Sequence, residues 1–94
     1  MPEAVKATAE AAICNKLGLH IRPSRQLAEL ARTFDAEVTV RNGDRSAAAD
    51  SQLDLLMLVA NKGAQIELTA TGPQADEAVA AIVRLIENRF GESE

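Results

Sequence analysis

The sequence predicts an α+β fold in which one sheet of four short strands is covered on one face by three helices. Its apolar residues alternate in some stretches and recur every three or four residues in others, which gives the element order β-α-β-β-α-β-α. The 94 residues predict a single domain over 1–94, since a second would need roughly 50 residues with a core of its own. With many alanines and only two aromatic side chains, both Phe, the core is thin and suits two packed layers.

The first strand is predicted near the N-terminus. Residues 1–7 are expected to form a frayed tail, and residues 8–14 are the strand candidate. The side chains expected to share one face of this strand are Ala9, Ala11 and Ile13. Residues 15–18, Asn-Lys-Leu-Gly, are typical of a loop and separate the strand from the first helix.

The first helix is indicated by apolar residues at i, i+3, i+4 and i+7, namely Leu27, Leu30, Ala31 and Phe34. Pro23 suits the first turn of this helix, where its missing N–H costs nothing. Because the residue before a proline is biased away from helical angles, we predict that the helix begins at Pro23 and not at Arg22.

A β-hairpin is predicted next. Residues 37–40 alternate as a half-buried strand, and Asn42-Gly43 is the strongest short signal for a hairpin turn. Residues 45–49 form the returning strand, and their small side chains indicate that another element packs closely on it.

A short second helix is predicted over 52–59. Ser51 and Asp54 match a capping box, with a hydroxyl at the N-cap and a carboxylate three residues later, and Gly63 stops the element. The side chains expected to line the core are Leu53, Leu56 and Met57, and those expected to point elsewhere and leave apolar surface exposed are Leu55 and Leu58.

The last strand and the last helix follow. Residues 66–70 alternate as a strand, and Gly72-Pro73 opens the helix. The apolar stripe of this helix comprises Val79, Ile82, Val83, Ile86 and Phe90. Gly91 is expected to end the helix, and the acidic tail over 91–94 is expected to be solvated.

Composition and charge exclude several classes of function. The net charge of −4 and the pI of about 5.0 leave no basic footprint for duplex nucleic acid. No apolar run approaches the roughly 20 residues of a membrane span, and the N-terminus lacks the apolar centre of a signal peptide. We therefore expect a cytoplasmic protein that neither binds nucleic acid nor inserts into a membrane.

One cysteine and one histidine limit the chemistry further. Cys14 cannot form an internal disulfide, and Cys14 and His20 cannot make a four-ligand zinc site, so we predict no metal and no cofactor. Cys14 is expected to be a small buried strand residue and not a nucleophile. A hydrolase built from Ser24, His20 and a carboxylate is disfavoured, because a chain this small and rich in alanine offers little substrate cavity.

The candidate reactive group is His20, at the boundary between a loop and a helix N-terminus. The first N–H groups of a helix lack internal partners, so those of Ile21 and Arg22 can bind an anion. The helix dipole disfavours imidazolium and leaves a neutral ring with a nucleophilic lone pair. Arg22 can offer a bidentate guanidinium to a phosphoryl group, and Lys16 and Arg25 add positive charge nearby. These parts indicate a transient phosphohistidine; the alternative is an ordinary capping or surface histidine.

The stretch Gly18-Leu19-His20-x-Arg22-Pro23 resembles the active-site signature of the histidine-containing phosphocarrier protein (HPr) family of the phosphoenolpyruvate-dependent phosphotransferase system. The resemblance extends over residues 8–90 and implies an open-faced β-sandwich with a four-stranded antiparallel sheet. The stretches that are more similar to the nitrogen-related branch of the family than to its sugar branch are residues 15–18, 34–38, 55–58 and 70–74.

The resemblance implies a stoichiometric carrier and not an enzyme with a substrate of its own. His20 would accept a phosphoryl group on Nδ1 from an Enzyme I-type donor and pass it to an Enzyme IIA-type acceptor. The Arg22 side chain and the backbone N–H groups of Ile21 and Arg22 would hold the group, and we expect a monomer. The chain departs from the family at Ile21, where a small or hydroxylated residue is usual, and at Arg25, where a small one is usual.

The start of the second helix carries two further candidates. In Gram-positive members of the family the serine matching Ser51 is a regulatory phosphorylation site, but Gln52 and Asp54 interrupt the usual apolar pattern, so we favour a plain N-cap. In the family this helix start is the docking surface beside the histidine, which makes Leu53 and Leu56 docking candidates as well as core candidates. Gln52 and Asp54 also motivate a rival function, a regulatory adaptor that keeps the fold and signals by docking.

Overall fold

The computed structural model describes residues 5–94 and confirms the predicted α+β class and element order. One antiparallel sheet contains the four strands in the spatial order β1-β4-β2-β3. The strands are β1 (Lys6–Ala12), β2 (Glu37–Asn42), β3 (Arg45–Ala48) and β4 (Gln65–Thr71). The last two strands in the sheet order, β2 and β3, form the predicted hairpin at Gly43.

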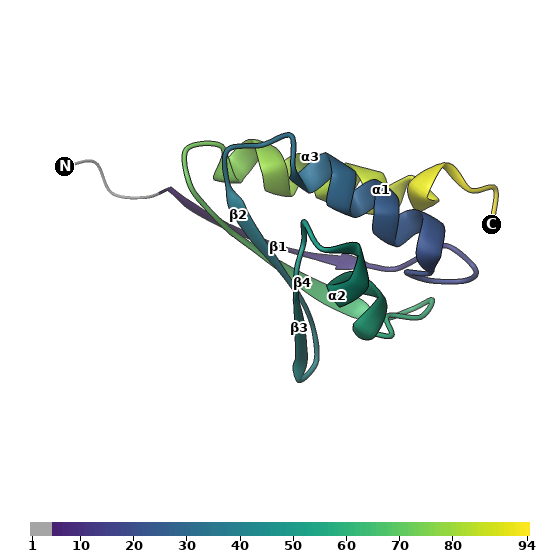
Figure 1. Cartoon of the computed structure of the whole chain (residues 1–94). Coiled ribbons are helices and arrows are strands. Elements are labelled where there is room, and N and C mark those ends of the chain that lie inside the picture. Colours follow the sequence, from purple (N-terminus) through teal and green to yellow (C-terminus); the bar gives the residue numbers. More distant parts are fainter. Residues whose placement is uncertain (1–4) are drawn as a thin grey trace.

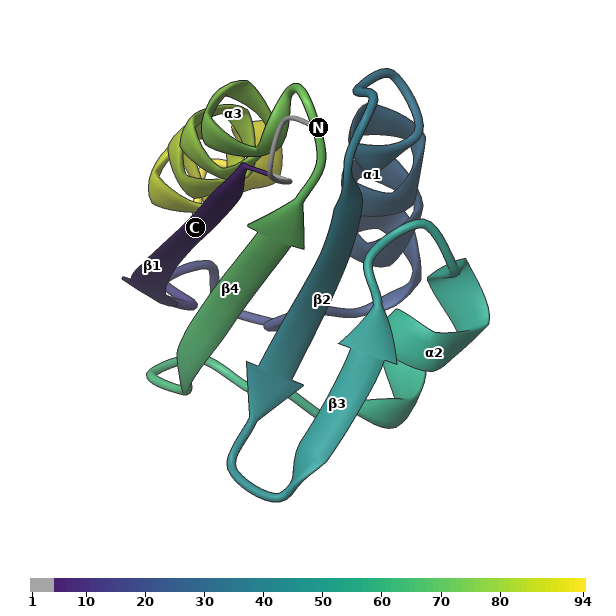
Figure 2. The same ribbon diagram turned by 90° about the vertical axis from the view of Figure 1, so that its left-hand side faces the viewer.

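Three helices lie on one face of this sheet (Figure 1). They are α1 (Ile21–Ala31), α2 (Gln52–Met57) and α3 (Ala75–Glu87). Helix α3 packs on β1 and β4, α2 packs on β3, and α1 lies between α3 and α2, as Figure 2 shows. The opposite face of the sheet carries no helix of the described chain, so the fold is an open-faced sandwich. No helix within residues 5–94 is long and apolar enough to cross a membrane.

The core lies between the sheet and the helices and follows the strand alternation. On β4, Ile66, Leu68 and Ala70 are fully buried, and the residues between them face the open side. Across the ladder Leu68 is opposite Ala9 on one side and Val40 on the other. Fully buried alanines such as those of α3 let backbones approach closely, which is how a core with few aromatic residues fills its volume.

Strand β1 begins earlier than predicted. Lys6 pairs with Thr71 and Ala7 with Ala70, so both belong to the sheet and not to a tail. Val5 lies just before the strand, and residues 1–4 of the predicted tail lie outside the described residues. The seven residues of β1 match the seven of β4, because a strand extends as far as its partner offers a ladder. The predicted face is correct, but Cys14 follows the strand and is only half-buried.

Helix α1 also begins earlier than predicted, at Ile21 instead of Pro23. The bias of proline against a helical residue before it is overridden here, because Pro23 is the third residue of the helix. At that position an N–H has no intrahelical acceptor, so the proline ring breaks no hydrogen bond. The earlier start places His20 directly at the N-cap.

The face that α2 turns to the core is the opposite of the predicted one. Leu55 and Leu58 are buried, whereas Leu53 and Met57 are exposed and Leu56 is half-buried. The helix has only six residues and ends at Met57. A helix of six residues, three of them leucines, shows no decisive periodicity, so packing on β3 and α1 selects the face.

The C-terminal end of the chain differs from a simple helix stop. Helix α3 ends at Glu87, and Arg89–Gly91 form a short 3₁₀ turn, η1. Arg89, Phe90 and Gly91 all have positive φ, at 56°, 55° and 78°. Phe90 is buried, as its apolar pattern predicts, but it reaches the core from this turn and not from the helix.

Candidate functional site

His20 is the N-cap of α1, and its side chain leaves the helix free. Its backbone is extended, with φ −81° and ψ −168°, and its carbonyl oxygen accepts the N–H of Ser24 at 3.0 Å. The imidazole makes no capping hydrogen bond to the helix. The ring is about one third exposed, at 32%, so it is accessible from solvent while one side is held by the protein.

The loop before His20 requires Gly18. Its φ is +69°, and a Cβ there would lie 2.5 Å from the carbonyl oxygen of Ala60. The close approach lets the N–H of Leu19 donate to that same oxygen at 2.9 Å, which ties the loop to the segment after α2. Glycine is the residue that tolerates both the left-handed angle and the contact.

Ser24 is buried beneath the loop and takes no part in chemistry with His20. Its hydroxyl donates to the carbonyl oxygen of Leu19 at 3.0 Å. This bond holds the loop on the first turn of α1 and argues against the hydrolase arrangement, which needs the hydroxyl directed at the imidazole.

One nitrogen of the imidazole is hydrogen-bonded to Glu92, in the last residues of the sequence. His20 Nε2 lies 2.9 Å from Oε2 of Glu92, whose side chain is only 15% exposed. The expectation of a solvated tail is therefore wrong for Glu92. Sequence patterns could not reveal this contact, because it joins residues 72 positions apart.

Asn15 holds the Glu92 carboxylate in place against the imidazole. Its Nδ2 donates to the carbonyl oxygen of Gly18 at 2.7 Å and to Oε1 of Glu92 at 3.0 Å. Both partners are acceptors, which determines the orientation of the buried amide. The hydrogen bond from Asn15 lowers the pKa of Glu92; burial opposes that shift, and the hydrogen bond with His20 adds to it. Glu92 is therefore a carboxylate that only accepts hydrogen bonds.

The carboxylate selects the tautomer of the ring. Since Glu92 can only accept, a neutral His20 carries its proton on Nε2, and the lone pair is then on Nδ1. Within residues 5–94 no hydrogen bond is made to Nδ1. The nitrogen that is free to act as a nucleophile is therefore Nδ1.

The start of α1 is suited to an anion. The N–H groups of Ile21 and Arg22 have no intrahelical acceptor, and the first turn contains no acidic residue. Of the three nearby cations, Lys16 pairs with Glu94 at 3.4 Å and Arg25 pairs with Glu29 at 3.7 Å. The exposed Arg22 has no ion pair within the described part of the chain, so its charge is available.

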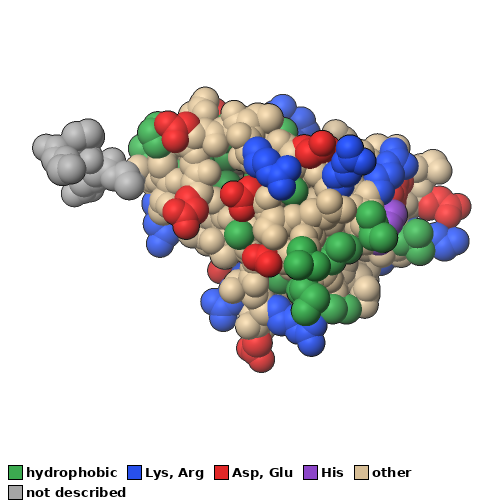
Figure 3. Space-filling view, viewed as in Figure 1, with side chains coloured by type: hydrophobic (Ala, Val, Ile, Leu, Met, Phe, Trp, Pro, Cys, Tyr) green, Lys and Arg blue, Asp and Glu red, His purple; other side chains and the backbone are tan. Residues whose placement is uncertain are grey.

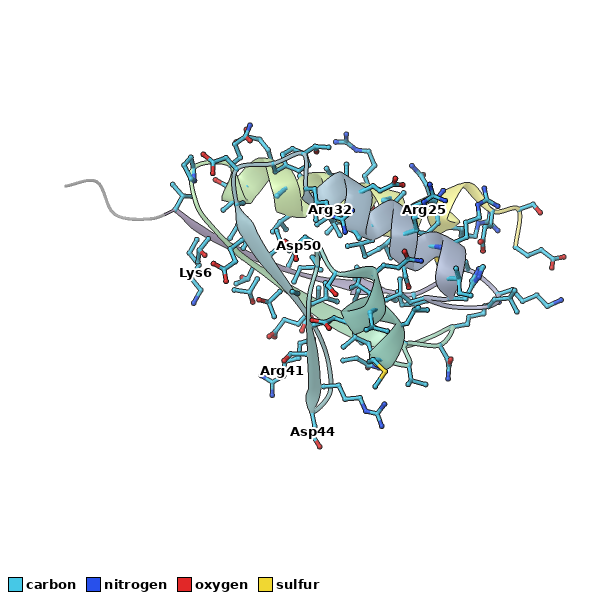
Figure 4. All side chains as sticks on the ribbon, in the orientation of Figure 1. Lys6, Arg25, Arg32, Arg41, Asp44 and Asp50 are labelled. Atoms are coloured by element: carbon cyan, nitrogen blue, oxygen red, sulfur yellow. The ribbon has the colours of Figure 1, made fainter. Side chains whose placement is uncertain are left out.

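Two further arginines, Arg25 in α1 and Arg32 at its C-cap, lie toward opposite ends of the helix. Figure 4 labels Arg25 near the His20 end of the helix and Arg32 toward the other end, where Arg32 Nη2 donates to the carbonyl oxygen of Asp50 at 2.7 Å. Arg32 therefore has a structural partner far from the imidazole.

Ser51 is an N-cap, as predicted. Its hydroxyl accepts the N–H of Asp54 at 3.2 Å, but its own N–H donates to the carbonyl oxygen of Ala48 at 3.1 Å, so only half of the capping box forms. Gln52 Nε2 donates to the carbonyl oxygen of Ile21 at 3.2 Å. This hydrogen bond joins the start of α2 to the start of α1.

Exposed apolar side chains lie at the start of α1, along α2 and just after α2. We call them the apolar patch: Ile21, Leu53, Met57 and Val59, which are 67%, 69%, 66% and 57% exposed. Figure 3 shows hydrophobic side chains gathered over α2 beside the single histidine. The docking candidate Leu53 is exposed, but Leu56 is half-buried. Met57 and Val59 were missed because their exposure depends on the face that α2 selects.

Comparison with known proteins agrees with this geometry. The family model described as PTS HPr component phosphorylation site matches residues 7–88. The chain belongs to the HPr family. It is 52% identical over 89 residues to phosphocarrier protein NPr of Escherichia coli K12, covering 94% of this chain and 97% of that one. It is 43% identical to phosphocarrier protein HPr of Cupriavidus necator, covering 87% and 92% of the two chains.

A solved HPr structure has the same fold. The crystal structure of HPr-C-His from Thermoanaerobacter tengcongensis superposes with a TM-score of 0.89 at 32% identity, covering 94% of this chain and 99% of that one. The chain is thus an HPr-type phosphocarrier of the phosphotransferase system, and its predicted similarity to the nitrogen-related branch is confirmed by the NPr relatives.

Proposed function

We propose that the protein carries a phosphoryl group on Nδ1 of His20, accepting it from an Enzyme I-type donor and delivering it to an Enzyme IIA-type acceptor. One observation carries this proposal. The hydrogen bond between Nε2 and Glu92 leaves the Nδ1 lone pair available at an uncapped helix N-terminus. The family membership supplies the chemistry of the cargo.

The transfer balances without added water or cofactor. The Nδ1 lone pair forms a bond to phosphorus, and the bond between phosphorus and the donor atom breaks in line with it. The electron pair of that bond returns to the donor, and the proton on Nε2 stays in place. Passing the group to an acceptor is the same step in reverse order, so the protein ends unchanged after one delivery.

The surroundings of His20 suit a group that must be held and then released. The N–H groups of Ile21 and Arg22 and the guanidinium of Arg22 can bind the phosphoryl oxygens without enclosing them. An open site favours direct transfer between two docked proteins. The apolar patch supports docking through Leu53, and Leu56 contributes beneath it. We expect small, transient interfaces and a monomeric cytoplasmic carrier that is not itself an enzyme.

The test is the intact mass of the purified protein after incubation with phosphoenolpyruvate and an Enzyme I-type protein of the same organism. We expect one added phosphoryl group that is lost in acid and is absent from His20→Ala. An Enzyme IIA-type protein should then remove it. No addition, with a donor that is shown to phosphorylate itself, would refute the carrier function. A target that binds equally well to His20→Ala would then favour the rival adaptor.

A further inference from the structure

The last residues of the sequence turn back toward α1, so that Glu92 contacts His20. We call residues 88–92 the C-terminal hook. Two of its residues that are not glycine, Arg89 and Phe90, adopt left-handed angles, which are unfavourable for such residues. The burial of Phe90, which is 1% exposed, retains this conformation, and the N–H of Glu92 donates to the carbonyl oxygen of Arg89 at 2.9 Å. The backbone is thus held in a strained turn that ends at Glu92.

The two acidic side chains of the tail are placed very differently. The Glu92 side chain is 15% exposed and uses both oxygens, Oε1 for Asn15 and Oε2 for His20. The Glu94 side chain is 70% exposed and makes one surface ion pair, with Lys16 at 3.4 Å. Only the first of them is fitted to the imidazole, so general attraction of an acidic tail to basic residues does not explain the contact.

We propose that Glu92 is a positioning residue for phosphoryl transfer, which holds His20 in the tautomer with its proton on Nε2 and balances the positive charge of the phosphorylated ring. The inference rests on the proposed role of His20. When Nδ1 gives its lone pair to phosphorus while Nε2 keeps its proton, the ring acquires positive charge. A carboxylate 2.9 Å from Nε2 stabilises that charge, and the proton remains between the two groups.

Asn15 completes the arrangement. It binds Glu92 on the oxygen that the imidazole does not use and binds the loop at Gly18 with its other hydrogen. The carboxylate therefore cannot rotate away from Nε2 without losing the partly buried hydrogen bond from Asn15. Such support is how an acidic group keeps a catalytic imidazole in one orientation.

The experiment compares the wild-type full chain with Glu92→Gln and the matched control Glu94→Gln. Both substitutions keep the side-chain shape and remove one negative charge from the same tail. In Glu92→Gln the amide oxygen can accept from Asn15 Nδ2 while the amide NH2 donates to His20 Nε2, which favours the tautomer with its proton on Nδ1. The fraction of each neutral tautomer is read from the ¹⁵N shifts of the imidazole at alkaline pH. The probe for transfer is phosphoramidate, whose P–N bond breaks as Nδ1–P forms, with ammonia leaving.

We expect the wild type and Glu94→Gln to hold the proton on Nε2 and to be phosphorylated on Nδ1. Glu92→Gln should show a mixture of tautomers and some phosphorylation on Nε2 visible by ³¹P NMR. Its rate should be about tenfold lower, because a neutral hydrogen bond replaces a charge-assisted one that is roughly twice as strong. Tautomer fractions, product position and rate equal to those of Glu94→Gln would overturn the inference. If phosphoramidate modifies no variant at all, the three proteins are compared using the Enzyme I-type donor. No addition from that donor refutes the proposed function, whereas equal tautomer fractions in Glu92→Gln and Glu94→Gln refute the role of Glu92 on their own.

Discussion

The N-termini of α1 and α2 lie side by side and are joined by the hydrogen bond from Gln52 to Ile21, yet they are chemically opposite. The α2 end is satisfied by its own residues: Ser51 caps the N–H of Asp54, and the Asp54 carboxylate lies in the first turn. The α1 end has neither feature, because His20 turns its side chain away and no acidic residue follows it.

The difference explains how one of two adjacent helix ends becomes an anion site. Every helix N-terminus presents unpaired N–H groups and a partial positive charge. At α2 a hydroxyl already accepts one N–H and a carboxylate already balances the partial positive charge, so an incoming phosphoryl group is repelled. Where the capping residue is an outward-facing histidine, as at α1, the same backbone is open to the cargo. We infer that the capping residue decides whether a helix start in this protein binds an anion, as at His20, or only stabilises the helix, as at Ser51.

The largest effect in this comparison is expected from Arg22→Ala. Arg22 is exposed and lacks an ion pair within residues 5–94, so its loss should change the free energy of unfolding by less than about 0.5 kcal/mol. Transfer should slow by roughly 10- to 100-fold, since a hydrogen bond to a charged group contributes about 1.5–3 kcal/mol. Single-turnover transfer and thermal unfolding measure the two. A marked loss of stability would instead make Arg22 a structural residue.

A smaller effect is expected where α2 contributes docking and not chemistry. Leu53→Asp places a charge in the apolar patch and should raise the KM for the protein donor about tenfold, as for a moderate interface contact. Its rate with phosphoramidate should stay that of the wild type, because the small donor needs no docking surface. The control is Val5→Asp, another exposed apolar residue, which lies directly before β1 and outside the patch. Equal effects of both substitutions would contradict a local docking surface.

The third effect is a loss of stability at the start of α2, which Ser51 caps. Ser51→Ala removes the acceptor of the Asp54 N–H and should lower the free energy of unfolding by about 1 kcal/mol. For a domain of this size that is a fall in Tm of roughly 4–8 °C. Ser51→Asp should restore the cap, and neither variant should alter phosphorylation of His20. Calorimetry and intact mass together check this. Slower phosphorylation in Ser51→Ala would link the two helix ends functionally.

Local chemistry made most of this predictable from sequence. The position of His20 and Arg22 at a helix start, the hairpin at Gly43 and the cap at Ser51 each depend on neighbours within four residues. The face of α2 does not, because six residues with several leucines are compatible with more than one orientation. The packing of neighbouring elements decides it.

Glu92 shows the same limit more strongly. Its tail has no apolar period, and only the left-handed turn anchored by Phe90 directs it to His20. That turn contains two non-glycine residues at positive φ, a conformation that is uncommon for such residues and is not predicted from their sequence. A buried acidic partner for a histidine could have been suspected, but nothing in the sequence distinguishes Glu92 from Glu94.

The smallest effect concerns pH and returns to the two helix ends. The α2 end has a carboxylate in its own first turn, whereas the α1 end obtains one from the chain terminus, through His20. The hydrogen bond from Asn15 and then the contact with His20 hold the pKa of Glu92 below its ordinary value near 4.5. Its stabilising contribution is therefore complete above that ordinary value and is lost as pH falls through the lower native pKa.

Urea unfolding across the acidic range tests this sign. Glu92→Gln should be less stable than the wild type at neutral pH, and the difference should shrink as the pH falls below about 4.5. Glu94→Gln should show little difference at any pH, because an exposed ion pair contributes little. A gap between Glu92→Gln and the wild type that widened in acid would mean that the carboxylate strains the α1 end, and that the hook is retained by Phe90 alone.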